Sequence, residues 1–108
     1  MMRKEKRIKL GEAGIVITGK TPPTKIKEFF NGNYPFITPS DIKDFKVRIL
    51  DSVERHLSQK WFEKNIKYSL PPKSICYVCI GSTVGKMCMT GALSFTNQQI
   101  NSIVCDKK

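Results

Sequence analysis

Residues 74–105, SICYVCIGSTVGKMCMTGALSFTNQQINSIVC, contain one charged side chain, that of Lys86. Four short segments in this stretch are β-branched, aromatic or otherwise apolar in character and are separated by turn-forming residues: 74–80, 86–90, 92–95 and 100–104. Segments of this length and composition are typical of β-strands. The stretch therefore predicts the β-sheet core of the protein.

The residues before this core carry most of the charge. Sixteen of the nineteen Lys and Arg residues lie at or before Lys73. Leu70-Pro71-Pro72-Lys73 predicts a turn at the boundary, because proline restricts the residue before it and lacks an amide donor. A chain of 108 residues accommodates one domain. We therefore expect a single domain, 1–108, with a basic part, 1–73, and a strand core, 74–105.

The basic part contains three further candidate strands. Residues 15–18 and 34–37 are apolar or β-branched and read as short strands. In residues 45–49, apolar side chains alternate with Lys46 and Arg48. That alternation predicts a half-buried strand with a basic outer face.

Two short helices are expected between these strands. Thr24 is a candidate cap for a helix over 25–30, and Asn31-Gly32 would end it by supplying a left-handed backbone position. Ser58 is a candidate cap for a helix over 59–64. The expected fold class is therefore α/β of the mixed α+β kind: a small antiparallel or mixed β-sheet core with short helices.

The formal net charge of +10 favours a polyanionic partner. Much positive charge on a small surface attracts nucleic acid at long range, although other basic proteins share this balance. The basic N-terminal residues are followed by no apolar run long enough for a secretory signal or a membrane span. We therefore expect a cytoplasmic protein that makes no membrane contact and keeps its thiols reduced.

Four cysteines raise the question of a metal site. Cys76 and Cys79 form a C-x-x-C pair, with Cys88 and Cys105 further along the chain. Residues three apart in a strand point to opposite faces, and the segment 74–80 is strand-like throughout. Buried structural cysteine is therefore the favoured interpretation, and zinc the alternative.

The glycine-containing loop Gly81-Ser82-Thr83-Val84-Gly85-Lys86 resembles a phosphate-binding loop but is one residue too short. It is followed by Met87, where a magnesium-binding Ser or Thr would be required. A turn that joins two strands is the simpler interpretation. Its two hydroxyls and one lysine are still suited to contact a DNA phosphate.

Two other polar stretches have two readings each. In Thr18-Gly19-Lys20-Thr21-Pro22-Pro23, hydroxyls, amides and one lysine suit phosphate contacts, whereas a rigid structural turn is equally compatible. The carboxamides of Asn97-Gln98-Gln99 and Asn101 suit the edge of adenine, or the backbone groups of neighbouring residues.

No catalytic constellation is evident. His56 is the only histidine, and no serine or cysteine stands in a motif with it that suggests acyl transfer. The acidic residues are scattered among lysines, as on a solvated face: Asp41, Asp44, Asp51 and Glu54. We expect no catalytic residue, no bound metal and no cofactor.

Four stretches in this order and spacing are more specific than any one alone. They are Thr18-Gly19-Lys20-Thr21-Pro22, Pro35-Phe36-Ile37-Thr38-Pro39-Ser40-Asp41-Ile42, Cys79-Ile80-Gly81-Ser82-Thr83-Val84-Gly85-Lys86, and Thr96-Asn97-Gln98-Gln99-Ile100-Asn101. Together they resemble the target recognition domain of type I restriction-modification specificity subunits. The resemblance extends from about Lys9 to Val104.

The resemblance implies a domain that binds double-stranded DNA and reads one half of a bipartite site. It implies that the domain has no active site, and that partner methyltransferase and restriction subunits methylate adenine and cleave DNA. Such subunits normally carry two of these domains joined by long helices, so we expect a truncated, incomplete domain here. The candidate DNA contacts are Thr18, Lys20, Thr21, Lys25, Lys46, Arg48, Ser82, Thr83 and Lys86.

Three alternatives stay open at this point. The chain could be a non-functional remnant whose missing end prevents DNA binding. It could be the recognition segment of a fused restriction-methylation enzyme, in which case methyltransferase motifs would lie outside these residues. It could also be a small zinc protein.

Overall fold

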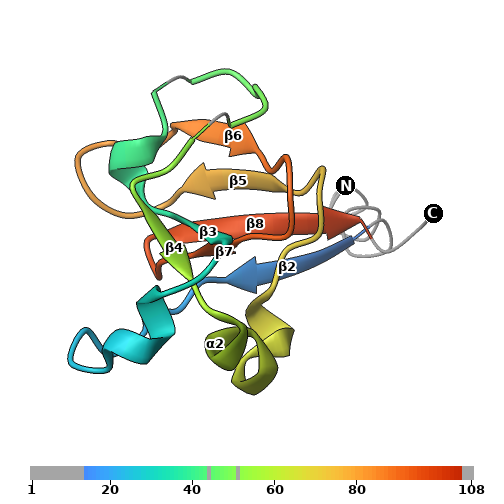
Figure 1. The fold of residues 1–108 in the computed structure, drawn as a ribbon. Coiled ribbons are helices and arrows are strands. Elements are labelled where there is room, and N and C mark those ends of the chain that lie inside the picture. The colour runs from blue at the N-terminus through green and yellow to red at the C-terminus, as the bar shows by residue number, and fades with distance from the viewer. Residues whose placement is uncertain (1–13, 44, 51, 106–108) are drawn as a thin grey trace.

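A four-stranded antiparallel sheet forms the larger half of the computed structural model, which describes residues 14–43, 45–50 and 52–105 (Figure 1). Its strand order is β2 (Gly14–Thr18), β8 (Ile100–Cys105), β5 (Ile75–Val78) and β6 (Met87–Met89). These strands confirm the predicted segments 15–18, 74–80, 86–90 and 100–104, with shorter bounds in β5 and β6. Some of the charged residues considered in the sequence lie outside the described residues. They are the basic N-terminal residues Arg3, Lys4, Lys6, Arg7 and Lys9 and the acidic residues Asp44 and Asp51.

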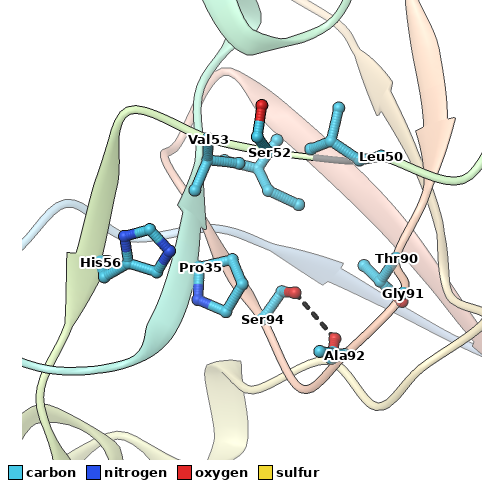
Figure 2. A pocket seen from close by; sticks show the side chains of 10 residues that line it. Pro35, Leu50, Ser52, Val53, His56, Thr90, Gly91, Ala92 and Ser94 are labelled. Atoms are coloured by element: carbon cyan, nitrogen blue, oxygen red, sulfur yellow. Dashed lines mark hydrogen bonds between the residues drawn. The ribbon is translucent and has the colours of Figure 1, made fainter.

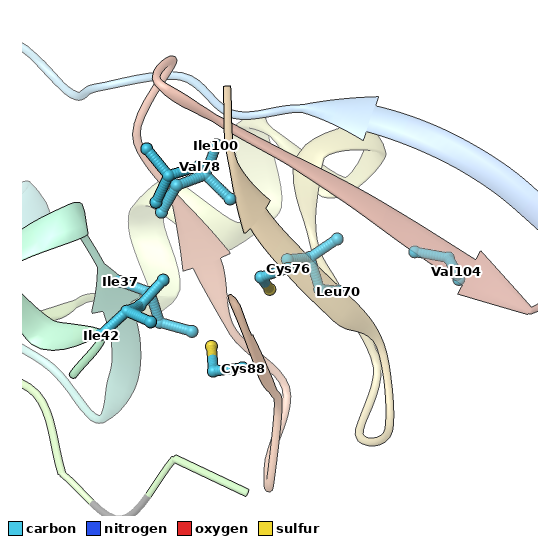
Figure 3. Close-up of a cluster of buried hydrophobic side chains, with 8 residues drawn as sticks. All are labelled: Ile37, Ile42, Leu70, Cys76, Val78, Cys88, Ile100 and Val104. Carbon is cyan, nitrogen blue, oxygen red and sulfur yellow. The ribbon is translucent and has the colours of Figure 1, made fainter. Parts of the chain in front are cut away.

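One face of this sheet is buried because apolar and small residues alternate along its strands. In β5, Cys76 and Val78 are buried, whereas Ile75 and Tyr77 are partly exposed. Inward side chains of this sheet pack with Ile37, Ile42 and Leu70 from outside it to form one cluster (Figure 3), whose members from the sheet are Cys76, Val78, Cys88, Ile100 and Val104. A period of two places alternate side chains on one face, so the sequence pattern sets which face is buried.

A second, three-stranded sheet packs beside the first. Its order is β4 (Arg55–Leu57), β3 (Tyr34–Ile37) and β7 (Phe95–Thr96). Strand β3 pairs antiparallel with β4 and parallel with β7, so this sheet is mixed. The strand predicted over 34–37 is confirmed, and β4 is a strand that the sequence pattern did not reveal.

Aromatic side chains fill the space between the small sheet and its helices. The buried aromatic members are Phe29, Phe36, Trp61 and Phe95, and the aliphatic Leu57 is buried among them. Trp61 comes from α2 (Gln59–Lys64) and meets the Phe29 ring edge-on at 5.0 Å. The predicted cap of this helix is confirmed, because the Ser58 hydroxyl accepts a hydrogen bond from the Trp61 amide at 3.4 Å. The described residues also form three short 3-10 helices: η1 (Lys27–Phe30), η2 (Pro39–Asp41) and η3 (Ile66–Tyr68).

Each sheet draws strands from both parts of the chain. Strand β2 comes from the basic part and joins the sheet of β5, β6 and β8, whereas β7 follows the first core strands and joins β3. Small sheets and short helices in this arrangement confirm the predicted mixed α/β class. None of the helices formed by the described residues has the length and apolar character that crossing a bilayer requires.

The strand predicted over 45–49 is wrong. Phe45 and Ile49 are each 62% exposed, and only Ile49 makes a bridge, with Met89 of β6. The core side of β6 is already filled by its own buried Cys88. The apolar side chains of the segment 45–49 therefore find no free part of the core to pack into. Phe45 instead lies against the backbone of Gly85.

The helix predicted over 25–30 is shorter than expected and begins differently. Only Lys27–Phe30 is helical, as the 3-10 turn η1, and Thr24 does not cap it because the residue before the helix is Ile26. Asn31 has a φ of −113°, so the predicted left-handed ending is wrong. Gly32 is required for another reason: a Cβ there would lie 2.4 Å from the Leu57 carbonyl oxygen.

The strand predicted over 92–95 is displaced. Strand β7 begins only at Phe95, and Ser94 makes an isolated bridge with Leu70. The amides of Ser94 and Leu70 each donate to the other's carbonyl at 2.8 Å. The segment before β7 is thereby fixed to the turn that precedes β5 rather than to a sheet.

Candidate nucleic-acid interface

The four sequence motifs meet at one turn, residues 97–99, which connects β7 to β8. The Asn97 amide donates to the carbonyl of Ile37 at 3.2 Å, and the Cys79 amide donates to that of Gln99 at 2.9 Å. The Lys20 amide donates to the Thr96 carbonyl at 3.0 Å. Figure 1 shows the matching arrangement of the backbone, with the ends of β2, β3 and β5 and the start of β8 on the same side of the molecule. We call this turn and its partners the motif junction.

Gly19 makes the motif junction possible because, without a side chain, its backbone can lie close to Thr96 and Asn97. A Cβ on Gly19 would lie 2.2 Å from the Asn97 carbonyl oxygen and 2.2 Å from the Thr96 hydroxyl oxygen. Real Cβ atoms do not come so near to backbone oxygens, so any side chain here forces the two loops apart. The requirement for glycine at this position is therefore steric.

Substituting Gly19→Ala is therefore expected to destabilise the fold by about 1–3 kcal/mol, the usual cost of overpacking. Gly91→Ala is the matched control, because its Cβ would come no closer than 3.1 Å to the Cγ2 methyl of the exposed Ile49 and 3.8 Å to the Leu50 carbonyl oxygen. That variant should change stability by no more than about 0.5 kcal/mol. Urea unfolding measures both, and equal losses would contradict the close-approach argument.

The carboxamides at the motif junction are used inside the protein. The Asn97 side-chain oxygen accepts from the Gln99 amide at 3.0 Å, and the Asn101 side-chain amide donates to the Cys79 sulfur at 3.0 Å. The hydroxyls of Thr18 and Thr21 donate to the side-chain oxygens of Asn101 and Gln98. These bonds favour the structural reading of the polar residues. Among the predicted contacts in the first loop, the ammonium group of Lys20 is left as the exposed donor.

An open groove of about 440 Å³ lies beside the motif junction. We call it the motif groove. The loop between β5 and β6 forms one wall, with the predicted contacts Ser82, Thr83 and Lys86. The remaining lining comes from η2, the motif junction and β4: Thr38, Pro39, Ser40, Arg55, Asn97 and Gln99, together with Ile80 and Gly81 of the loop. Hydroxyls, carboxamides and two basic groups thus line one concave surface.

The loop from Gly81 to Lys86 is a connection between strands, as the sequence favoured. Gly81 and Gly85 have φ values of 102° and 104°, a backbone conformation that favours glycine. The next element is β6, a strand and not a helix, so the arrangement differs from a nucleotide-binding loop.

Two lysines share one aromatic ring next to the motif junction. The ammonium group of Lys20 lies 5.5 Å from the centre of the Tyr68 ring, and that of Lys67 lies 5.4 Å from it. The electron-rich ring face attracts both cations and limits their motion. Neither Lys67 nor Tyr68 was among the predicted contacts, because η3 comes near the first loop only in the folded chain.

The remaining predicted basic contacts lie outside the motif groove. Lys25 is exposed in the turn before η1. Lys46 and Arg48 are exposed on the segment 45–50, which runs along the edge of β6. Because Phe45 lies against Gly85, this segment touches the same loop that carries Ser82 and Thr83.

A smaller cavity of about 250 Å³ contains His56 (Figure 2). The hydroxyl of Ser94 donates to the Ala92 carbonyl at 2.8 Å, and the hydroxyl of Thr90 donates to the Pro71 carbonyl at 2.7 Å. The hydroxyls of Ser94 and Thr90 thus donate to backbone oxygens and not to His56.

Two of the four cysteines are buried, as the structural interpretation predicted, and Cys79 is partly exposed. Cys76 and Cys88 are buried and face each other across β5 and β6, whereas Cys79 lies beyond the end of β5. The hydrogen bond with Cys76 and burial both raise the pKa of the Cys88 thiol. In the part of the chain that the structure describes, no three His, Cys, Asp or Glu side chains are grouped to hold a metal.

Comparison with known proteins connects this geometry with one family. A family model described as "Type I restriction modification DNA specificity domain" matches residues 2–108. The chain is 42% identical over 97 residues to the type I restriction enzyme HindI specificity subunit of Haemophilus influenzae. It is 29% identical over 96 residues to the MjaIX specificity subunit of Methanocaldococcus jannaschii. These alignments cover 90% and 89% of the chain but only 20% and 22% of the relatives, so the chain spans about a fifth of their length.

Solved structures agree on the fold. The HsdS subunit from Thermoanaerobacter tengcongensis superposes with a TM-score of 0.63 at 17% identity. A chain from a study of the assembly and conformational transition of the type I R-M system superposes with a TM-score of 0.61 at 19% identity. Each match covers 89% of this chain and 22% of the other. The architecture predicted for a target recognition domain is thereby confirmed.

Proposed function

The chain belongs to the type I restriction modification DNA specificity domain family, and from this premise we propose that it binds double-stranded DNA sequence-specifically as part of a specificity subunit. In this proposal it contributes recognition and no catalysis, and it needs no cofactor. Methyltransferase and restriction subunits, its proposed partners in the cytoplasm, would methylate and cleave the bound DNA.

The convergence of the four motifs on one side of the fold is the observation that carries this proposal. A scaffold that fixes several loops on one side presents a continuous surface to a ligand. Two basic groups and several neutral donors line the motif groove, and the paired lysines on Tyr68 lie next to the motif junction. Basic groups provide affinity for phosphates, and neutral donors with guanidinium groups provide contacts to base edges.

The predicted contacts take different roles in this proposal. Lys20, Lys67 and Lys86 neutralise backbone phosphates, with Lys25, Lys46 and Arg48 as outer basic contacts. Ser82 and Thr83 donate hydrogen bonds from the groove wall. Thr18 and Thr21 act mainly by fixing the first loop to the motif junction.

Selection from random duplexes tests the proposed function. The purified 108-residue chain, alone and with the methyltransferase subunit, is mixed with the duplexes, and the retained DNA is sequenced. We expect a short enriched sequence. Retention of duplexes with no enriched sequence, or of none at all, in both arms would overturn the proposal.

Lys20→Met should weaken binding to all duplexes alike and make the slope of log affinity against log salt shallower by about 0.9, the value for one phosphate contact. Lys60→Met is the matched control, because the Lys60 ammonium is already paired with Glu28 at 2.6 Å. Fluorescence anisotropy titrations at several salt concentrations measure both slopes. A Lys60 variant that loses as much slope as the Lys20 variant would refute the specific role of the first loop.

A further inference from the structure

Arg55 is the basic residue of the motif groove that the sequence analysis did not identify. It opens β4 and stands opposite Phe36 of β3 in the strand register. Its guanidinium carbon lies 5.9 Å from the centre of the Phe36 ring. The ring thereby provides a surface against which the guanidinium group can be held in one orientation.

The backbone that carries Arg55 is fixed from a second side. The Asp41 carboxylate of η2 accepts the amide of Glu54 at 3.1 Å and the amide of Thr38 at 2.9 Å. Since Glu54 directly precedes Arg55, the start of β4 is attached to the same short helix that lines the groove. A donor held in this way loses little conformational entropy when it binds a ligand.

The donors of Arg55 are free to meet a ligand. Within the described residues the guanidinium group makes no ion pair, and the nearby Asp41 carboxylate is occupied by Thr38 and Glu54. The other groove residues from η2 and the motif junction are uncharged and, apart from Pro39, carry hydroxyls or carboxamides. Because no carboxylate of the described residues pairs with it, the exposed guanidinium group of Arg55 is available for recognition.

Two DNA groups accept two hydrogen bonds from one guanidinium group: a phosphate, and the O6 and N7 atoms of guanine in the major groove. Phosphates need charge but little orientation, and Lys86 and the two lysines on Tyr68 supply that charge through ammonium groups, which have no planar pair of donors. Reading a base needs a fixed donor pair, which is what the contacts of Arg55 with Phe36 and of Glu54 with Asp41 provide.

We infer that Arg55 reads a guanine base in the sequence that this chain recognises, donating two parallel hydrogen bonds to O6 and N7. This inference rests on the proposed function and assigns one specificity-determining residue to it. The hydroxyl and carboxamide residues around Arg55 would contact the neighbouring base pair or its phosphates. Lys86, in the same groove, would contact the backbone without regard to sequence.

The test compares the enriched sequences and the salt slopes of the 108-residue chain and its Arg55→Met and Arg55→Lys variants. Methionine keeps an apolar side chain over Phe36 but has no donors, and lysine keeps the charge but lacks the paired donors. Both variants should lose preference for guanine at one position by about 5- to 150-fold, with the other positions unchanged. Their salt slopes should equal that of the unsubstituted chain.

Lys86→Met is the matched control within the groove. It should lower affinity for every sequence, reduce the salt slope by about 0.9 and leave the preferred sequence unchanged. If Arg55→Met behaves like Lys86→Met, Arg55 contacts a phosphate and the inference is wrong. Guanine preference that survives in both Arg55 variants also overturns it. A parent chain that enriches no sequence overturns the proposed function, and the inference with it.

Discussion

Increasing the salt concentration from roughly 50 to 200 mM should weaken DNA binding by about 500-fold. Five lysines are counted as full phosphate contacts, Lys20, Lys25, Lys46, Lys67 and Lys86, whereas Arg48 is not counted because it already has an interaction partner within the protein. Each neutralised phosphate contributes about −0.9 to the slope of log affinity against log salt, so these lysines together give a slope of about −4.5. A fourfold increase in salt then lowers the affinity by nearly three orders of magnitude. Anisotropy titrations with one duplex across the salt range measure the slope directly.

The double variant Lys20→Met, Lys67→Met provides the internal control for this slope. Both ammonium groups lie on the Tyr68 ring. Their joint loss should make the slope shallower by about 1.8. An affinity that changes less than about fivefold over the same salt range would exclude a binding mode based on phosphate neutralisation. A double variant with the parent slope would place the contact surface away from Tyr68.

The strands that pair over a buried face could be predicted from their sequence. The alternation of Cys76 and Val78 with Ile75 and Tyr77 matches a strand with one face in the core, and β5 lies where it was expected. The segment that begins at Phe45 has a similar alternation but forms no strand. An alternating pattern produces a strand only if a neighbouring element can pair with its backbone along its length. The segment that begins at Phe45 makes a single bridge with β6, at Met89.

The composition of the site could be predicted only in part. The resemblance pointed to the loops that carry Lys20, Ser82 and Lys86, and the structure brings those loops to one side of the fold. It did not identify Arg55 or Lys67. Arg55 reaches the groove through the register of β3 with β4, a contact between distant segments that leaves no local pattern. A strand of three residues is too short for its period to be recognised.

Strand β7 links the aromatic core to the motif junction, because its first residue packs in the core and its second belongs to the junction. Phe95 is 1% exposed and meets the Tyr34 and Phe62 rings at 6.2 and 6.4 Å. The next residue, Thr96, provides the carbonyl that accepts the Lys20 amide. Phe95 also pairs with Phe36, the residue on which Arg55 lies. Core packing at Phe95 therefore fixes both the first loop and the groove arginine.

Phe95→Ala should destabilise the protein by about 3–5 kcal/mol, the range for removing a buried aromatic side chain. This is a large share of the roughly 5–15 kcal/mol that stabilise a typical domain. The loss combines the transfer free energy of the ring with the cavity left among Tyr34, Phe36 and Phe62. Trp61 is buried in the same cluster and is the only tryptophan, so its fluorescence during urea unfolding reports the change.

Phe45→Ala is the matched control, because it removes the same ring from a position that is 62% exposed. Its expected effect is within about 0.5 kcal/mol. If the two substitutions cost the same, the Phe95 ring is not packed in a core. If Phe95→Ala is tolerated, the motif junction must be held by its hydrogen bonds alone, and Gly19→Ala should then be the more damaging change. The expected order, with Phe95→Ala more costly than Gly19→Ala, follows from the cavity and overpacking ranges.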